Sequence, residues 1–406
     1  MNRRLVSLIG FALLVSLFGA GAHAATGADG KAPTTAAWVL PEGRFGPIPF
    51  RNTIREALPA FLKPHAQNVT EIWPGAAYIR NTHEIAQANG GHMAVNMGAV
   101  VYANLDTLTY QARNKAPAEK AEQAMPGDGT PDEHGILKTM HGYNGYVYRD
   151  ARWGFGPDLL VTWTFYGSGP HYNPIGYYDV AKEFGGGDTF YKGARNRYFY
   201  TVGGYGVAVA VDFMKGFFVG DKVVSPYQTN ADGSLAERFA FVKGDGSPPD
   251  TSWQNPVDQY GSTCLTVVED RKLLVGVTKT PYLRILDLDP KSATFNKLAT
   301  VAIDPPADLS QAEYGAMEPD RAGFTWLAGK GIVGLHKLST GETIGLQIRL
   351  GTRPMVDRAT MKIVFRKVPS LANGVFGSHV AVPDRGITFL NVGPDAPPLQ
   401  FNWPKL

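Results

Sequence analysis

The sequence has very little cysteine: Cys264 is the single one among 406 residues. One thiol cannot form an internal disulfide, and it excludes a haem attachment pair and any metal site built from several cysteines. The stability of the chain must therefore come from packing. Cys264 lies in an apolar run typical of a strand, so we expect it to be a buried core thiol.

Long apolar runs are also scarce. The first, Leu5–Phe18, follows two arginines and ends before an Ala-His-Ala site at residues 22–24. This order of charge, apolar run and small-residue site is typical of a cleavable secretory signal. No later segment approaches the roughly 20 apolar residues that span a bilayer, so no membrane span is expected. We predict a signal over residues 1–24 and an exported protein, periplasmic or secreted, with twin-arginine export as the alternative route.

The charge balance gives no sign of a polyanionic partner. Lys and Arg number 39 against 36 Asp and Glu, and loss of the two signal arginines reduces the excess from three to one. No block of Lys and Arg along the chain could neutralise several phosphates together. We therefore expect no nucleic-acid partner. The oligomeric state is left open.

Several strong catalytic motifs are incomplete or absent. The segment His83–Gln87 begins like the zinc-protease helix motif, but it has glutamine where the second histidine is required. The G-x-S-x-G elbow of common esterases is missing. Gly329–Gly331 lacks the spacing of a phosphate loop, and Gly185–Gly187 is followed by no dinucleotide fingerprint. Nucleotide chemistry is therefore not expected.

Short runs rich in Val, Ile, Tyr, Phe and Thr alternate with turn signals, which 47 glycines and 29 prolines supply. Such runs are typical of strands in an all-β fold. Helix signals are few, and Ile54–Leu62 and Ala116–Ala124 are the best. The clearest strand runs are Met93–Ala103, Leu159–Tyr166, Tyr198–Val211, Cys264–Val277, Tyr282–Leu288, Ile344–Leu350 and Gly386–Val392.

A weak internal repeat narrows the all-β options. The phrase GGHMAV at residues 90–95 recurs as GSHVAV at residues 377–382 and more loosely as GSTCLT at residues 261–266. Each copy precedes a turn and a second strand. This is the order of the first two strands of a propeller blade.

Further passages resemble blades of the β-propeller superfamily, in particular its surface-layer and quinoprotein-type repeats. Leu338–Ile344 resembles the Thr-Gly turn between two apolar strands of those blades, and Leu283–Pro290 resembles the strand that leads into such a turn. Gly323–Trp326 resembles the end of a sialidase-type Asp-box hairpin, although Asp320 stands one residue too far upstream. The resemblance implies an architecture without a specific family. The adjacent-cysteine disulfide of many quinone-dependent dehydrogenases cannot form here, which weakens that activity as a third possibility.

We predict an all-β fold in a single domain, a β-propeller over residues 25–406 with an irregular N-terminal segment. Units of roughly 40 to 50 residues suit about seven or eight blades. Only three short strands fit after His379, so we expect Ala36–Leu40 to complete the last blade and close the ring. The alternative is a pair of β-sandwich or barrel domains that divide near Ser247–Pro256.

Histidines at matching positions of the repeat form the first candidate site. The first strand of each blade lines the central channel, so we expect His92 and His379 to face the channel mouth together. Imidazole is a good ligand for transition metals, and His141 and His171, each among glycine and tyrosine, are the candidates to complete the site. One transition metal is the cofactor that such a site would hold. Simple hydrogen bonding of each histidine to turn backbone is the alternative.

The same histidines could act without a metal. Abstraction of a proton next to a carboxylate by His141 or His171, with a tyrosine as the acid, is the chemistry of polysaccharide β-elimination. The tyrosines considered for this role are Tyr143, Tyr172 and Tyr178. No complete catalytic set can be assembled from the sequence, so whether the chain is an enzyme stays undecided.

Most tyrosines lie between Tyr143 and Tyr205, together with several Trp and Phe residues. Aromatic faces stack on sugar rings and on flat apolar ligands, and arginine can neutralise a uronate carboxylate. The alternatives are a core of aromatic strands and solvated arginines. The residues expected to bind a ligand are Tyr143, Trp153, Trp163, Arg195 and Arg197.

Two functional hypotheses follow from these patterns. The first is an exported protein that binds a glycan, a small molecule or a partner protein through its aromatic surface or channel mouth. The second is an exported His-dependent enzyme, with or without a metal, in lyase, hydrolase or oxidoreductase chemistry. The two differ in whether the predicted histidines converge in space.

Overall fold

The computed structural model describes residues 36–69, 75–88, 95–96, 100–113, 122–123, 146–163, 175–186, 206–221, 239–247, 249–257, 263–317, 319, 323–367 and 379–406. The chain divides into two units, residues 1–35 and 36–406, and the described residues belong to the second. These residues are all-β with little helix, as predicted. None of the helices described is long and apolar enough to cross a membrane.

The strands form antiparallel groups that follow the chain, and we number six such groups among the described residues. Group 1 contains β2 (Gly75–Ile79), β3 (Glu84–Ala88), β5 (Val100–Asn104) and β6 (Thr109–Arg113). Group 2 contains β8 (Tyr146–Arg149), β9 (Leu159–Trp163), β10 (Ile175–Asp179) and β11 (Phe184–Gly186). Group 3 contains β12 (Gly206–Val211), β13 (Gly216–Asp221) and β14 (Phe239–Lys243).

Group 4 contains β15 (Thr263–Val268), β16 (Leu273–Thr278), β17 (Tyr282–Asp287) and β18 (Leu298–Asp304). Group 5 contains β19 (Thr325–Leu327), β20 (Gly331–Lys337), β21 (Thr343–Arg349) and β22 (Ala359–Lys367). Group 6 contains β23 (His379–Val382), β24 (Ile387–Leu390), β25 (Leu399–Asn402) and β1 (Phe45–Pro47). Parallel pairing of β18 with β22 joins groups 4 and 5. The remaining elements are β4 (Val95–Asn96), β7 (Glu122–Gln123), α1 (Ile54–Ala57) and α2 (Gln311–Gly315).

Buried apolar side chains fill the spaces between consecutive groups. Each hydrophobic cluster of the described residues contains members of two neighbouring groups, and the clusters run from group 1 through group 6 and back to group 1. Because the last cluster joins group 6 to group 1, the order of contacts closes on itself, which is a propeller-like arrangement. Representative pairs within these clusters, in group order, are Ala77 and Leu160, Val147 and Phe217, Phe218 and Leu274, Val275 and Phe324, Leu335 and Phe401, and Phe389 and Ile85.

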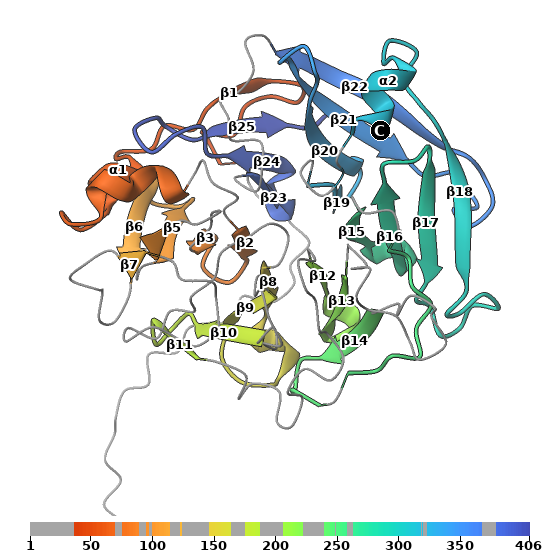
Figure 1. The fold of residues 1–406 in the computed structure, drawn as a ribbon, viewed down its shortest axis with the longest axis horizontal. Helices are drawn as coiled ribbons and strands as arrows, with labels where there is room; N and C mark the ends of the chain where they lie inside the picture. Colours follow the sequence, from red (N-terminus) through yellow and green to blue (C-terminus); the bar gives the residue numbers. More distant parts are fainter. Residues whose placement is uncertain are drawn as a thin grey trace, which may run out of the picture. The chain divides into compact units, whose positions relative to one another are not determined.

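The first strand of each group lies nearest the centre (Figure 1). Contacts connect β23 with β2, β2 with β8, β8 with β12, β12 with β15 and β15 with β19. Among the described residues, each of these strands is the terminal strand of its sheet and pairs with one strand. The other edge therefore carries backbone N–H and C=O groups that no described strand satisfies.

The turn from the first to the second strand is similar in several groups. The last residue of this turn has a left-handed backbone conformation in three groups. It is Lys215 with φ of 54°, Lys272 with φ of 50° and His83 with φ of 51°. Short 3-10 helices precede Lys215 and Lys272 and begin with Asp212 and Glu269. The turns thus place charged side chains at one end of the innermost strands.

A segment near the N-terminus closes the arrangement, as the strand count predicted. Strand β1 pairs antiparallel with β25, with Phe45 opposite Phe401. The strand that completes group 6 is β1 and not the expected Ala36–Leu40. The backbone of Ala36–Leu40 forms hydrogen bonds with side chains of β25 and does not pair with it as a strand. Gln400 donates to the Trp38 carbonyl at 2.8 Å and Asn402 donates to the Leu40 carbonyl at 2.6 Å.

Other expectations are not met. The described residues form six groups, so the expected seven or eight blades are not confirmed. A domain boundary near Ser247–Pro256 is not seen, because Trp253 and Val257 pack in the cluster shared by groups 3 and 4. Glu122–Gln123 form β7, paired with β4, where a helix over Ala116–Ala124 was expected.

Two of the three copies of the sequence repeat lead into an innermost strand. The copies at residues 261–266 and 377–382 lead into β15 and β23, which are innermost strands. The copy at residues 90–95 ends in β4, which pairs with β7, whereas the innermost strand of group 1 is β2. His92 itself lies outside the described residues, so its equivalence to His379 stays a prediction.

Lys330 secures the interface between groups 5 and 6. It is only 8% exposed, and its Nζ donates to Asn402 Oδ1 at 2.7 Å and to the Trp403 carbonyl. Burial lowers the pKa of Lys330, and Glu42, whose carboxylate lies 3.6 Å from Nζ, opposes this shift. The turn between β19 and β20 is thereby fastened to the end of the chain.

We expect Lys330→Met to lower the free energy of unfolding by about 1 to 3 kcal/mol, because two buried acceptors lose their donor. Urea denaturation at neutral pH measures this change. Lys291→Met, at an exposed turn position, is the matched control and should change stability by less than about 0.5 kcal/mol. Equal effects of the two substitutions would contradict the role given to Lys330.

Candidate functional site

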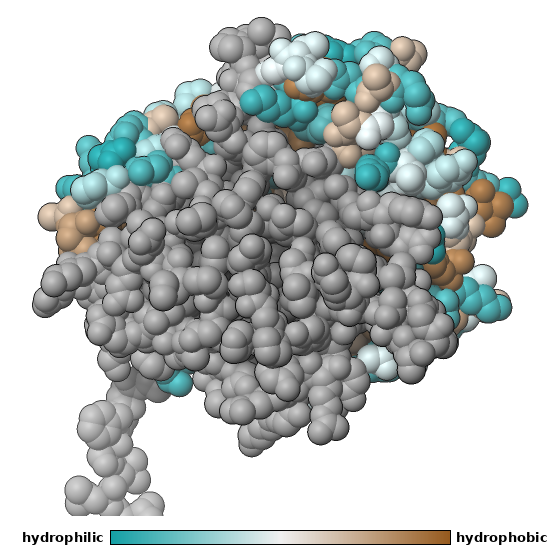
Figure 2. Space-filling model, viewed as in Figure 1, coloured by the Kyte–Doolittle hydropathy of each residue, from teal (hydrophilic) through white to brown (hydrophobic). Residues whose placement is uncertain are grey.

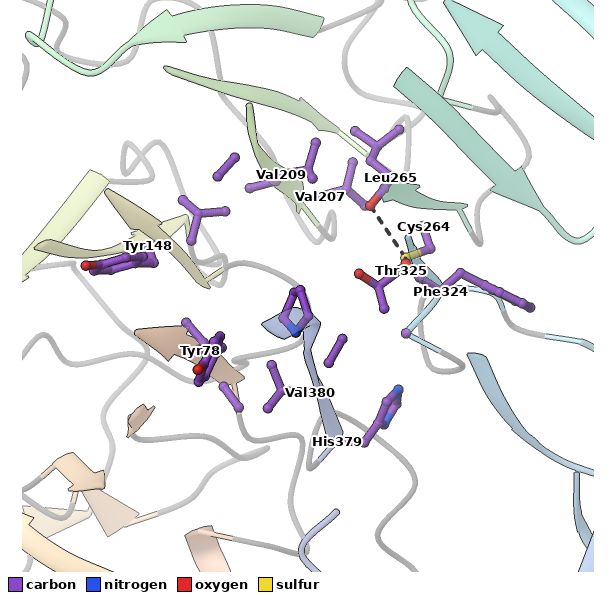
Figure 3. Close-up of a pocket in the computed structure, with 18 of the residues that line it drawn as sticks. Tyr78, Tyr148, Val207, Val209, Cys264, Leu265, Phe324, Thr325, His379 and Val380 are labelled. Carbon is purple, nitrogen blue, oxygen red and sulfur yellow. Dashed lines mark hydrogen bonds between the residues drawn. The ribbon is translucent and has the colours of Figure 1, made fainter. Parts of the chain in front are cut away.

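The innermost strands surround a central pocket with a volume of about 230 Å³ (Figure 3). Consecutive residues of one strand line it, as in Ala76–Tyr78 and Val207–Ala210. Side chains of consecutive strand residues point to opposite faces, so it is the edge of each strand that borders the pocket. The backbone of these edges is therefore part of the lining.

The side chains of the wall are mostly small and apolar. Alanine, valine and glycine predominate, and small side chains leave the strand backbone within reach of a bound molecule. The wall therefore combines apolar contact with backbone donors and acceptors. The small residues of the lining are Ala76, Ala77, Val147, Val207, Ala208, Val209, Ala210, Gly323, Val380 and Ala381.

One side of the pocket carries Cys264, Thr325 and His379. Cys264 is buried, as predicted, and its Sγ donates to the Phe324 carbonyl at 3.1 Å. His379 packs closely against Gly323, because a Cβ added to this glycine would lie 2.0 Å from His379 Nε2. Figure 3 shows Cys264, Phe324 and Thr325 gathered on the side opposite Tyr148.

Two tyrosines border the opposite side, Tyr78 from β2 and Tyr148 from β8. Their rings are buried in different clusters, that of Tyr78 between groups 6 and 1 and that of Tyr148 between groups 1 and 2. The Tyr78 hydroxyl donates to Asp384 and the Tyr148 hydroxyl donates to Asp158, both at 2.7 Å. Burial, together with these carboxylate acceptors, raises the pKa of both tyrosines well above the ordinary value. Both hydroxyls therefore stay protonated and remain donors.

Arg80 also borders the pocket, directly after β2, and pairs with Asp212. Asp212 follows β12, and β8 lies between β2 and β12, so this ion pair spans group 2. Burial and the nearby Asp212 raise the pKa of Glu269 to about 7, and Arg80 opposes the shift. The pocket thus has a charged end at the turns that follow the innermost strands.

Most of the sequence-predicted site residues lie outside the described residues. These are His92, His141, Tyr143, His171, Tyr172, Arg195 and Arg197. His379 lines the pocket, as expected for a residue of an innermost strand. Within the described ranges, no three His, Cys, Asp or Glu side chains are grouped so as to hold a metal. The metal site, whose other proposed ligands are not described, stays a prediction.

Two predicted aromatic residues are placed. Trp153 is 5% exposed, and its ring lies 5.3 Å from that of Phe217, inside the cluster between groups 2 and 3. Its position fits the alternative of an aromatic core. Trp163 is the last residue of β9. Tyr178, a considered acid, is buried, and its hydroxyl donates to the Arg113 carbonyl at 3.3 Å.

The surface was the other predicted binding region. The coloured part of the space-filling view is a mixture of hydrophilic and isolated hydrophobic residues (Figure 2). Large apolar side chains that are exposed in the described part come from separate segments. They are Phe213, Tyr282, Phe295, Val356 and Leu406.

The sequence analysis did not single out Tyr78, Tyr148 or Arg80. A short signal was present, because Gly75 and Gly145 each precede a tyrosine by three residues. A glycine and a tyrosine at this spacing are too common to predict a pocket residue by themselves. The partners of the tyrosines, Asp384 and Asp158, come from other turns and are not visible in the local pattern.

We expect Glu269→Gln to stabilise the protein at pH 8 and to have little effect at pH 4. The pKa of about 7 in the folded state lies above the ordinary value of 4.5, so the carboxyl contributes full stability below pH 4.5 and loses it as pH rises through 7. Glutamine keeps a neutral polar group at all pH values. Urea denaturation at both pH values measures the difference, and a gain that is equal at the two pH values would contradict the assignment.

Comparisons with known proteins add little. No protein-family model matches the chain, and no curated protein matches it. Among solved structures, the chain is similar to Sqt1 of Saccharomyces cerevisiae, with a TM-score of 0.39 and 9% sequence identity. This similarity covers 84% of this chain and 97% of that chain. A likeness of this size supports no conclusion about activity.

Proposed function

We propose that this protein is an exported six-bladed β-propeller that binds a small molecule in its central pocket. The observation that carries the proposal is the convergence of the innermost strands on one pocket of about 230 Å³. Pockets for drug-sized ligands have volumes of roughly 300 to 1,000 Å³, so this one suits a smaller molecule. The size favours a small molecule over a glycan chain or a partner protein as the occupant.

The lining supports a ligand that has both apolar surface and hydrogen-bonding groups. Backbone N–H and C=O groups at the strand edges can donate to and accept from a bound molecule. The alanine and valine side chains offer apolar contact beside them. The His-dependent enzyme remains the alternative function, and it would require His92, His141 or His171 to lie beside His379.

We expect Ala381→Phe to abolish binding of small polar fragments, because the added ring fills the pocket at β23. Saturation-transfer NMR with a mixed fragment library measures binding. Ala293→Phe, at an exposed turn between β17 and β18, is the control and should retain all hits. Fragments that bind both variants equally, or no hits on the unmodified protein, would contradict the proposed site. A second filling variant, Ala208→Phe, covers the case in which Ala381→Phe does not fold.

The N-terminal pattern supports export and predicts a defined processing site. We expect the protein recovered from a bacterial periplasm to begin at Ala25, since cleavage follows the small-residue site at residues 22–24. Intact-mass spectrometry measures the N-terminus. Ala24→Arg should keep the signal attached. A full-length mass in the periplasmic fraction would overturn the cleavage site.

A further inference from the structure

We propose that a second pocket, between groups 4 and 5, binds a small zwitterion, an α-amino acid with an apolar side chain. This inference goes beyond the proposed function and does not depend on it, because the second pocket shares no lining residue with the central one. The second pocket has a volume of about 270 Å³. Drug-sized ligands occupy pockets of roughly 300 to 1,000 Å³, so a smaller molecule such as an amino acid suits this one.

Three connections between strands form the second pocket. The turn from β15 to β16 contributes Arg271, the connection from β17 to β18 contributes acidic and hydroxyl side chains, and the connection from β21 to β22 contributes Arg353. Arg271 Nη1 donates to the Gly351 carbonyl at 2.8 Å, which joins the turn of group 4 to the connection of group 5. The walls of the pocket are therefore fixed relative to each other.

Arg271 supplies the cationic side of this pocket. Its Nη1 bonds to a neutral carbonyl, and among the described residues it forms no ion pair. Its Nε and Nη2 together form the fork that binds a carboxylate through two parallel hydrogen bonds. Arg353, the second arginine of the lining, is already paired, because its Nε and Nη2 donate to Asp357 Oδ1 at 3.0 and 2.8 Å. Arg271 is thus the arginine available to an anionic group.

Asp287 supplies the anionic side. It is only 4% exposed, and its carboxylate accepts hydrogen bonds from the Thr294 hydroxyl at 2.6 Å and the Asp289 backbone N–H at 2.9 Å, both neutral donors. No lysine or arginine in the described part of the chain pairs with it. Asp289 differs, because Lys272 Nζ lies 3.1 Å from its Oδ1. A carboxylate has about four acceptor sites, so Asp287 can accept further hydrogen bonds from an ammonium group.

The two charges border the same part of group 4. Asp287 lies opposite Leu273 in the antiparallel pair of β17 with β16, and Arg271 precedes Leu273 by two residues. A ligand with only a carboxylate would pair with Arg271 but would bring a like charge near Asp287. A ligand with only an ammonium group would meet the reverse. An α-amino acid carries both charges on one carbon atom and satisfies both side chains.

The remaining wall offers apolar contact. Pro354 and Met355 line the pocket from the β21–β22 connection, and both are half-buried. Burial of apolar surface against them favours an amino acid with an aliphatic side chain. A leucine-sized molecule therefore combines the charges and the surface that the pocket can bind.

The test compares three probes with the same isobutyl side chain. L-leucine carries both charges, N-acetyl-L-leucine carries only the carboxylate, and L-leucinamide carries only the ammonium group. We expect the mature protein to bind L-leucine at least about tenfold more tightly than either analogue, as measured by isothermal titration calorimetry at neutral pH. Equal or tighter binding of either analogue, or no binding of L-leucine, overturns the inference.

Charge variants connect this preference to the named side chains. We expect Arg271→Gln to weaken binding of L-leucine at least about tenfold and to leave the affinity of L-leucinamide unchanged. Asp287→Asn should weaken L-leucine similarly and leave N-acetyl-L-leucine unchanged. Arg51→Gln, at an exposed position before α1, is the matched control and should change none of the affinities. Arg271 is exposed, so Arg271→Gln tests the inference even if Asp287→Asn does not fold. An unchanged L-leucine affinity in Arg271→Gln overturns the inference.

The variant with a filled central pocket separates the two sites. We expect Ala381→Phe to bind L-leucine as the unmodified protein does, because Ala381 lines only the central pocket. Loss of L-leucine binding in folded Ala381→Phe would place the amino acid in the central pocket. That result overturns this inference and leaves the proposed function intact, whereas failure of the fragment screen affects the proposed function alone.

Discussion

The packing of every strand group against two neighbours is the constraint on which the rest of the structure depends. Each group has apolar side chains on both faces, as Ile85 and Ala86 show on adjacent positions of β3. A sheet with two apolar faces needs a cover on each side, and an open row of groups would leave two faces in water. Pairing of β1 with β25 brings the N-terminal strand into group 6, and the cluster that contains Phe389 and Ile85 joins group 6 to group 1. Closure is thus a requirement of the burial pattern and not an additional feature.

Closure also determines where a ligand can bind. It turns the innermost edge of each group toward the centre, where no further strand can pair with it. The side chains there must be small for the backbone to remain accessible, and the lining is in fact rich in alanine and valine. A few larger residues also border the pocket, among them Tyr78, Tyr148, Arg80 and His379, and the two tyrosine rings belong to the interfaces between groups.

The sequence predicted the local features well and the long-range ones poorly. The run Cys264–Val277 became β15 and β16, because strand periods and turn signals act over a few residues. The need for an N-terminal strand could be deduced from the number of strands left after His379. The number of blades, predicted from the chain length and a typical unit length, is not confirmed by the six groups of the described residues, because chain length does not show how many residues lie in the connections between strands. Tyr78 was missed because its partner Asp384 is 306 residues away, and only the closed ring brings the two together.

Two titratable groups, the buried His336 and the half-buried Glu269, act on stability in opposite directions. Burial lowers the pKa of His336 to about 4 from its ordinary value of 6.5, so its contribution is lost as pH falls from 6.5 towards 4. Glu269, with a pKa of about 7, loses its contribution as pH rises from 4.5 towards 7. Between pH 4.5 and 6.5, unfolding binds a proton at His336 and releases one at Glu269. The two residues therefore change the free energy of unfolding with pH in opposite directions. A flat stability profile in this range would therefore reflect compensation, and substitution of either residue alone would reveal the other.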